Sequence, residues 1–502
     1  MRSKHTIGVG WWLTLLFSVT SFAAVEDDLR LVNAIKNRDR AAARLLIEQG
    51  ANVNAAQGDG TTALAWAANR DDVETADLLI RSGAKVNSAD DYGVTPLMQA
   101  CTNRSAPMVE RLLRAGADPK STRWTGETPL MICARTGSAE AVQALLSYGA
   151  DPNVKENQQG HTALMRAVSE KHPEVVRALV ERGADVAARS KGGFTALLFA
   201  SQQGDLESAR ILLASGADVN EATPQYGTAL VVATASGREA VALFLLENGA
   251  DPNATDAYGI TALHYAVPRG FAGIDSVSVV FRPFEAVPPN MLALVKALLS
   301  HRANPNLQIV KDFPPYSRSP YALQTSLVGV TPFLLAAAAA DVDLMRILLG
   351  GGADPGLKSK DGSTALMMAA GVGRVDDRPS WEEARALEAV KMTTELGYDL
   401  NAANARGRTA LHGAAGIGAN AIIQFLAEKG ANLELRDRQG STPLKIAAGG
   451  APRGDGANRV YESTMDLLLK LGAKPLDSGA PNPSEVLEEP VIPRSISGAS
   501  QQ

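Results

Sequence analysis

The chain has 502 residues, a formal net charge of −5 and 21% charged residues. This negative balance offers no electrostatic footprint for nucleic acid, and no run of Lys or Arg indicates an anionic membrane surface. A chain of this length usually holds several globular domains, but an internal period overrides that expectation.

The N-terminus has the composition of a secretory signal peptide. Arg2 and Lys4 give a positive start, residues 7–22 are apolar, and Ser21-Phe22-Ala23 offers small residues at the two positions that a signal peptidase reads. We predict a signal peptide over residues 1–23 and an exported chain, periplasmic in a Gram-negative cell and otherwise secreted. The alternative is an uncleaved membrane anchor, for which the apolar run is short. No later stretch is long and apolar enough to cross a bilayer.

The stretch from Gly193 to Gln225 is a repeating unit, and variants of it recur along the chain. Thr195 is a good N-cap for a short apolar helix, which Gly204 ends. Asp205 can cap a second helix, whose apolar residues lie at helical spacing, and Gly216 ends it. Two short helices cannot bury their own apolar faces, so stacked copies must share one continuous core.

The capping threonine gives the period, which is nearly constant at the start of the array. Eleven copies occur: Thr62, Thr95, Thr128, Thr162, Thr195, Thr228, Thr261, Thr331, Thr364, Thr409 and Thr442. A twelfth, degenerate unit precedes them at residues 28–50. We therefore predict an all-α solenoid of about twelve helix-turn-helix units with short β-turn or hairpin tips, within residues 24–476.

These units closely resemble the ankyrin repeat. The family's T-P-L-H start is seen at Thr95-Pro96-Leu97 and at Thr261-Ala262-Leu263-His264, and its G-A-D finish at Gly216-Ala217-Asp218. The resemblance covers roughly residues 28–476. The histidine of the start is kept only at His264 and His412, and Met98 is typical of what replaces it elsewhere. We expect no change of fold, because adaptable apolar side chains fill the same space.

The resemblance implies a concave groove that binds a protein or peptide. In the family, the residues just before each threonine, and the pair seven and eight places after it, face that groove. Aromatic and Arg side chains are the usual energetic anchors of interfaces. We predict the following partner-binding residues: Tyr92, Trp124, Arg135, Phe194, Tyr258, Phe313, Tyr316 and Tyr321. The alternative is that ordinary solvated turns carry these residues by chance.

Insertions interrupt the C-terminal half. Two of them, near residues 268–290 and 308–328, enlarge the interval from Thr261 to Thr331 to more than twice the ordinary period, and shorter ones lie near 372–383 and 449–459. The second holds Phe313, Tyr316 and Tyr321 among prolines, which predicts a rigid loop on the turn side, near the groove. We expect these loops to extend the partner contact, with neutral drift as the alternative. Residues 477–502 are rich in Pro and Ser and are predicted to be a disordered tail.

The sequence offers no convergent set of catalytic residues. No His pair has the spacing of a helical zinc site, and there is no CxxC, no nucleophile elbow and no phosphate-binding loop. We expect no metal, no cofactor and no enzymatic activity. Cys101 and Cys133 occupy small-residue positions of neighbouring first helices. Buried free thiols are the expected state, and a disulfide between two repeats is the alternative.

The sequence thus predicts an exported, monomeric, non-enzymatic scaffold that binds an envelope or periplasmic protein through its groove and inserted loops. It predicts no nucleic-acid partner and no membrane span after signal cleavage. One alternative is an enzyme, or an enzyme-accessory subunit, with active groups in the insertions within residues 268–328, although the two loops at 268–290 and 308–328 contain no His or Cys. The other is a structural spacer without specific affinity.

Overall fold

The structure, a computed structural model, describes residues 29–267, 290–312, 326–373, 382–449 and 460–476. The chain divides into two compact units between Asp251 and Pro252. The expected signal peptide (1–23) and tail (477–502) lie outside the described residues, as do most of the four expected insertions.

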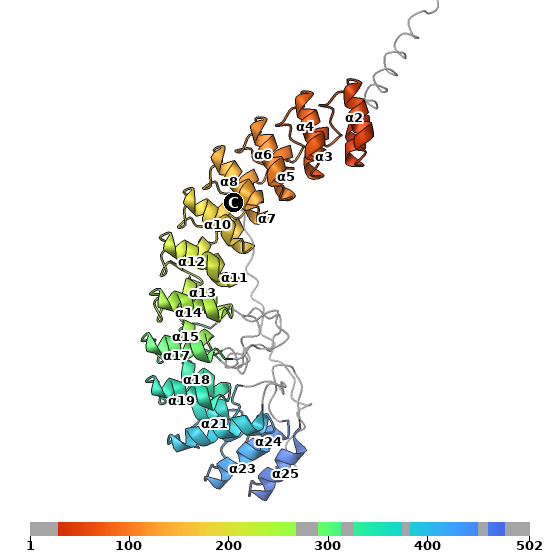
Figure 1. Cartoon of the computed structure of the whole chain (residues 1–502). Helices are drawn as coiled ribbons and strands as arrows, with labels where there is room; N and C mark the ends of the chain where they lie inside the picture. Colours follow the sequence, from red (N-terminus) through yellow and green to blue (C-terminus); the bar gives the residue numbers. More distant parts are fainter. Residues whose placement is uncertain (1–28, 268–289, 313–325, 374–381, 450–459, 477–502) are drawn as a thin grey trace, which may run out of the picture. The chain divides into compact units, whose positions relative to one another are not determined.

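In the N-terminal unit, pairs of short helices stack as two layers (Figure 1). A helical segment at 29–36 and α2 (Arg40–Glu48) form the degenerate first pair. The first helices that follow are α3 (Ala63–Asn69), α5 (Pro96–Thr102), α7 (Pro129–Thr136), α9 (Ala163–Ser169), α11 (Ala196–Gln203) and α13 (Ala229–Ala235). The second helices are α2 (Arg40–Glu48), α4 (Val73–Arg81), α6 (Ala106–Arg114), α8 (Ala139–Ser147), α10 (Pro173–Glu181), α12 (Leu206–Ala214) and α14 (Glu239–Glu247). Each helix packs on the equivalent helix of the next pair, as the predicted solenoid requires.

The C-terminal unit repeats this arrangement. Its first helices are α15 (Ala262–Tyr265), α18 (Pro332–Ala338), α20 (Ala365–Ala369), α22 (Ala410–Gly416) and α24 (Pro443–Ala447). Its second helices are α17 (Leu292–Ser300), α19 (Val342–Gly350), α21 (Glu383–Glu395), α23 (Asn420–Glu428) and α25 (Glu462–Lys470). The same layer-by-layer contacts join them. The fold class is therefore the expected all-α solenoid of helix pairs.

The eleven predicted threonines all stand at the N-cap of a first helix. Thr128 is representative, since its hydroxyl accepts from the N–H of Met131 at 3.3 Å. Thr195 and Thr228 also occupy the N-cap, but their hydroxyl oxygens are buried without a hydrogen-bond partner among the described residues. The expectation that Thr195 caps through its hydroxyl is therefore wrong, although its backbone position is right.

Buried apolar residues recur at a fixed position after each capping threonine. The residue two places after each capping threonine is leucine, or phenylalanine at Phe333, and it is at most 2% exposed throughout the array. Where the start motif lacks histidine, apolar side chains such as Met98 are fully buried in its place. Burial of this ladder of apolar side chains along the stack is what holds successive pairs together.

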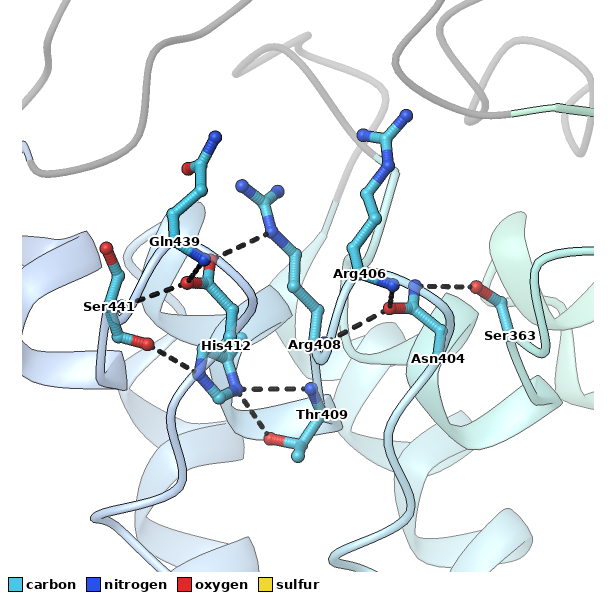
Figure 2. A network of polar contacts seen from close by, with 9 residues as sticks. Ser363, Asn404, Arg406, Arg408, Thr409, His412, Gln439 and Ser441 are labelled. Carbon is cyan, nitrogen blue, oxygen red and sulfur yellow. Dashed lines mark hydrogen bonds and ion pairs between the residues drawn. The ribbon is translucent and has the colours of Figure 1, made fainter.

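The two retained histidines brace neighbouring turns. His264 lies 2.8 Å from the hydroxyl of Thr261 through Nδ1 and 3.3 Å from the carbonyl oxygen of Val330 through Nε2. His412 makes the equivalent contacts to Thr409, at 2.9 Å, and to the carbonyl oxygen of Ser441, at 3.1 Å (Figure 2). Each ring thus joins the cap of its own helix to the turn of the next repeat.

Asparagines at the ends of repeats make a second bridge. The Asn87 side chain donates to the carbonyl oxygen of Gly116 at 3.0 Å and accepts from the N–H of Asp118 at 2.8 Å. Asn153 does the same with Gly183 and Asp185. Where the finish of the motif carries asparagine, that side chain therefore satisfies backbone groups of the next repeat.

The same connections between a second helix and the next first helix also form short hairpin tips. Only β1 (Ala222–Thr223) and β2 (Gly227–Thr228) are named strands within the described ranges, and they pair antiparallel, with Ala222 opposite Thr228. Isolated bridges from Ala56 to Thr62 and from Thr255 to Thr261 mark equivalent tips. This agrees with the predicted hairpin tips.

Cys101 and Cys133 form a disulfide between α5 and α7. Their Cα atoms lie 4.6 Å apart, and both residues are fully buried. The expectation of two free buried thiols is therefore wrong. The reason is geometric, because stacked first helices approach closely at these small-residue positions and bring the two Cα atoms within disulfide range.

Candidate interaction surface

Two exposed aromatic side chains stand on neighbouring tips of the N-terminal unit. The N–H of Trp124 donates to the carbonyl oxygen of Tyr92 at 3.2 Å, so the two tips are joined directly through their backbones. Tyr92 is 62% exposed and Trp124 is 67% exposed. Both were predicted from sequence, and the structure brings them together.

The tip that carries Tyr92 is rigidly built. The Asp90 carboxylate accepts from the N–H groups of Tyr92 and Val94 at 2.9 and 2.8 Å. Gly93 has φ +77°, and a Cβ there would lie 3.0 Å from the Cα of Arg123. Only glycine allows both the left-handed backbone and this close approach of the next tip. The Tyr92 and Trp124 backbones are consequently held in a fixed register.

Arg135 lies on the same repeat as Trp124 and is oriented by a buried acid. Glu127, directly before the capping threonine, has a side chain only 5% exposed and pairs with Arg123. The Nε of Arg135 lies 4.0 Å from the other oxygen of Glu127, and 42% of the Arg135 side chain is exposed. The predicted Arg135 therefore presents a guanidinium on the surface near this tip, with its carboxylate partner beneath.

The predicted Phe194 belongs to a cluster of aromatic rings. Its ring centroid lies 5.2 Å from that of Phe199 and 5.2 Å from that of Tyr226. His161 contacts the other side of Phe199, edge to face, with centroids 5.2 Å apart. Tyr226 is exposed, and the other three side chains are partly exposed. Such offset and edge-to-face arrangements give a firm apolar surface with polar rims.

A further ring lies near the start of the array. Trp66, on α3, donates through Nε1 to the Gln57 side chain at 3.0 Å. Lys36 Nζ and Arg70 Cζ lie 5.1 and 5.4 Å from its ring centroid. These cation–π contacts orient the indole, which is partly exposed.

Sequence reasoning missed Trp66, Phe199 and His161. Trp66 and Phe199 each stand four places after a capping threonine, an offset that the structure leaves partly exposed also at Gln99 and Arg166. Phe199 was interpreted simply as part of the apolar helix. The offset alone is not a signal for this row, because the residue four places after the cap is buried at Ile132, Val232 and Leu335.

Tyr258 is placed differently from the other predicted tips. It is partly buried, and its carbonyl oxygen accepts from the N–H of Val310 at 2.8 Å. Asp256 in the same tip accepts from the N–H of Tyr258 at 2.8 Å and from the hydroxyl of Tyr265 at 2.7 Å. Burial, opposed by these hydrogen bonds, raises the pKa of Asp256. Tyr258 is thus integrated into the turn more than it is presented to a partner.

One carboxylate clasps the two ends of the second insertion. Asp312 accepts from the Ser326 hydroxyl at 2.8 Å and from the N–H of Leu327 at 2.7 Å. Because Val310 bonds to Tyr258, the insertion leaves and rejoins the array on the turn side, as predicted. The remaining predicted residues, Phe313, Tyr316 and Tyr321, lie outside the described residues, as does the bulk of the expected first insertion at 268–290.

The described ranges hold no group of three or more His, Cys, Asp and Glu side chains that could bind a metal ion. In the same residues, every helix is too short or too polar to cross a bilayer.

Comparison with known proteins agrees with the repeat architecture. A family model described as ankyrin repeats in three copies matches residues 31–123, 116–190, 197–280 and 382–476, which is more than half of the chain. The chain is similar to an ankyrin repeat protein of Acanthamoeba polyphaga mimivirus, with 33% identity over 92 residues, covering 18% of this chain and 12% of the relative. It is also similar to mouse (Mus musculus) ankyrin repeat and SOCS box protein 16, with 32% identity over 147 residues, covering 29% of this chain and 31% of the relative.

Among solved structures, the human ASB11 ankyrin repeat domain is 28% identical and has a TM-score of 0.40, covering 44% of this chain and 98% of that one. The matched segments span less than a third of the length of either curated relative. The helix pairs, their caps and the family match lead to one conclusion. The chain belongs to the ankyrin repeat family, and its repeats indicate a protein–protein interaction scaffold.

Proposed function

We propose that this chain is an exported, non-enzymatic scaffold that binds an envelope or periplasmic protein, with the tips and first helices of the N-terminal unit as its contact surface. The observation that carries the proposal is the pair of exposed rings on adjoining tips, Tyr92 and Trp124. Buried apolar packing does not require either ring, since more than half of each is exposed. Exposed aromatic side chains on a rigid backbone are the usual anchors of protein interfaces.

The proposed contact surface also includes residues of two first helices, α7 and α11, and of the tips that precede α11 and α13. The Arg135 guanidinium and the rings of Phe194, Phe199 and Tyr226 provide apolar area with charged and polar edges. This composition fits a protein or peptide partner better than a small apolar ligand. A protein partner can bind exposed side chains directly, whereas a small apolar ligand usually requires a concave pocket. Preorganised contacts keep the ordering cost of binding low.

Export has two supports. One is the apolar, positively flanked segment at residues 1–23, with small residues before Ala24. The other is the Cys101–Cys133 disulfide, since disulfides persist in oxidising compartments and are rare in the cytosol. Under this proposal the mature chain is periplasmic in a Gram-negative cell and is otherwise secreted.

Affinity capture from the exported fraction of the native cell tests the contact surface. Three baits are compared: the mature chain, Tyr92→Ala with Trp124→Ala, and Tyr148→Ala as a matched control. Tyr148 is 46% exposed, but it is the C-cap of the second helix α8 and does not belong to a tip. A protein retained by the first and third baits, and lost from the second, supports the proposal. Equal retention by all three places the contact elsewhere, and no capture favours a structural spacer.

The mass of the chain recovered from its native cell tests export separately. Cleavage after Ala23 gives a chain that begins at Ala24 and holds no free thiol. A full-length, reduced chain in the cytosol would contradict export without affecting the contact surface.

A further inference from the structure

Three consecutive tips of the C-terminal unit are unusually basic. They precede Thr364, Thr409 and Thr442, and together they form what we call the cationic edge: Lys358, Lys360, Arg406, Arg408, Arg436 and Arg438. All are exposed except Arg408, which is partly exposed. The whole chain, in contrast, has 49 Lys and Arg residues against 54 Asp and Glu. The three tips are therefore locally rich in positive charge although the chain has a net negative charge. The six residues do not form a continuous run of Lys or Arg in the sequence.

Backbone hydrogen bonds hold the three tips together. The N–H of Ala405 donates to the carbonyl oxygen of Asp361 at 2.6 Å, and the N–H of Arg438 donates to that of Arg406 at 2.8 Å. Gly407 has φ +76°, and a Cβ there would lie 3.0 Å from the N of Arg438. The charged side chains therefore start from directly bonded backbones.

The two carboxylates in these tips are engaged by the turns themselves. Asp437 has a side chain only 2% exposed, accepts from the N–H groups of Gln439 and Ser441 at 2.9 Å each, and lies 3.6 Å from the Nε of Arg408. Asp361 accepts from the Ser359 hydroxyl at 2.6 Å. Asp437 therefore neutralises one of the six cationic side chains, Arg408, whereas Asp361 bonds to a residue of its own turn, Ser359.

The other basic side chains of the edge lack an acidic partner among the described residues. Across the described residues, no carboxylate pairs with Arg406, Arg438 or the two lysines. The Arg436 guanidinium donates within its own turn, to the carbonyl oxygen of Gly440 at 3.2 Å. The edge therefore keeps a local excess of positive charge on its exposed side.

Side-chain hydrogen bonds from Asn404 hold the backbones of two arginines of the edge in fixed positions. The Asn404 side chain accepts from the N–H groups of Arg406 and Arg408 at 3.0 and 3.1 Å and donates to Ser363 at 3.0 Å. Figure 2 shows the side chains of Arg406, Arg408 and Gln439 extending to the same side, away from the helices. Burial lowers the pKa of Arg408, Asp437 opposes that change, and repulsion from Arg406 adds to it. A bound anion would relieve that repulsion.

We propose that the cationic edge binds an extended acidic segment of a protein partner. Guanidinium groups donate two parallel hydrogen bonds to a carboxylate, which favours Asp and Glu side chains as their partners. Packed helices are spaced about 8–10 Å apart, and a peptide in the extended polyproline II conformation rises about 3.1 Å per residue with three residues per turn, so acidic side chains at every third position share one face and meet successive tips. The exposed Gln439 amide lies among them to bond the peptide backbone.

An acidic peptide fits this edge better than a nucleic acid or a membrane. The edge is only three tips long, and the chain around it is net negative, so a long polyanion would meet repulsion beyond the tips. This inference rests on the proposed scaffold function but uses a different surface, in the other unit.

The test measures fluorescence anisotropy of a labelled peptide built from Glu-Gly-Ser triplets, long enough to span three tips, with the full mature chain. The matched peptide carries Gln in place of Glu. We expect the Glu peptide to bind with an affinity that falls as salt rises, and the Gln peptide not to bind. Arg406→Gln with Arg438→Gln should weaken binding about tenfold or more, because charge-assisted bonds to two tips are lost.

A control variant makes the same change of net charge elsewhere in the unit. Lys296→Gln with Arg346→Gln alters exposed side chains on the second helices α17 and α19 and should bind the Glu peptide normally. Circular dichroism should show unchanged melting for both double variants. Equal loss in the two variants, or no binding of the Glu peptide by the native chain, would overturn the proposal.

Binding of other anions, a lipid vesicle and an oligonucleotide, is measured with the same variants. If phosphatidylglycerol vesicles or a single-stranded oligonucleotide bind through Arg406 and Arg438 while the Glu peptide does not, the acidic-peptide assignment is wrong. The Tyr92→Ala, Trp124→Ala chain should still bind the Glu peptide. A failure of partner capture at that aromatic surface is therefore distinguishable from a failure at the cationic edge.

Discussion

Cys101 and Cys133 are bonded although they stand at different offsets in their repeats, six places after Thr95 and five after Thr128. Both offsets are small-residue positions, where the neighbouring repeat places Ala68 or Ala100. Facing positions on stacked helices need not be equivalent in sequence, so a bridge across the stack joins residues one step out of register.

The disulfide should contribute to stability through the unfolded chain. Replacing both cysteines, Cys101→Ala with Cys133→Ala, should lower the free energy of unfolding by about 2–4 kcal/mol, because the open chain regains the entropy of the closed loop. Alanine fits both positions in other repeats, so packing should change little. Urea denaturation measures the loss. Thiol titration is the control: native and denatured chains should show free thiols only after reduction. Two titratable thiols in unreduced chain from its native compartment would contradict the bridge.

The buried His264 should make stability depend on pH. Burial lowers its pKa from the ordinary 6.5 to about 4. As the pH falls, the unfolded chain therefore takes up a proton before the folded chain does, so stability present at neutral pH is lost between about 6.5 and 4, by about 3 kcal/mol at the lower limit. Denaturation at pH 7 and pH 4 measures this for the native chain and for His264→Leu, which carries the residue found at Leu198 and Leu334. An equal loss in both proteins would show that other groups are responsible.

Gly93 should be less replaceable than Gly83. Both have positive φ, +77° and +88°, but a Cβ at Gly83 meets nothing within 4 Å, whereas at Gly93 it meets the Arg123 backbone. Gly83→Ala should cost about 1–2 kcal/mol from the left-handed backbone alone, and Gly93→Ala should cost more. Gly93→Ala should also disturb the Tyr92–Trp124 contact and weaken partner capture. Equal melting temperatures for the two variants would mean that the tips separate without penalty.

Asp437 should stabilise the tip that carries it. Asp437→Ala leaves two backbone N–H groups without an acceptor and Arg408 without its carboxylate, so we expect a loss of about 2 kcal/mol or more. Asp399→Ala is the control, since Asp399 is exposed and accepts one N–H bond, from Asn401 at 2.9 Å. That change should cost less than about 1 kcal/mol. Thermal melts of the two variants compare them directly.

Much of the fold could be predicted because each unit repeats the same local solution. A threonine caps the first helix, a leucine two places later is buried, and a glycine ends the turn, so each copy reinforces the interpretation of the others. Thr195 and Thr228 show the limit of this reasoning. They occupy the predicted position, yet their hydroxyls find no partner among the described residues, because cap geometry varies with the exact approach of the backbone.

The candidate surface was only partly predictable. Exposed Tyr92 and Trp124 followed from their place in the turns, whereas Phe199 looked like core because an apolar residue in a short helix usually is. Which side of such a helix remains accessible depends on how the next pair stacks. The position within the repeat does not decide this exposure, since Phe199 is partly exposed whereas Ile132 and Leu335, at the same offset from the cap, are buried.

The cationic edge was not predictable from any local run of charge. Arg406 and Arg438 belong to successive repeats, and Lys360 stands one repeat before Arg406, so a whole helix pair separates each from the next along the chain. Only the stacking of three tips brings them to one edge. Net charge, which is negative for the chain, conceals such a local excess.

The clasp at Asp312 has a consequence for how the array can change over evolution. The Asp312 carboxylate holds Ser326 and Leu327 beside the residue after which the insertion begins. The packing of the repeats before and after the insertion therefore does not depend on the number of residues between Asp312 and Ser326. Closing a longer flexible loop costs only about 0.6 kcal/mol for each doubling of its length. This position is therefore a site where new sequence can be acquired, exchanged or trimmed while the stack keeps its register.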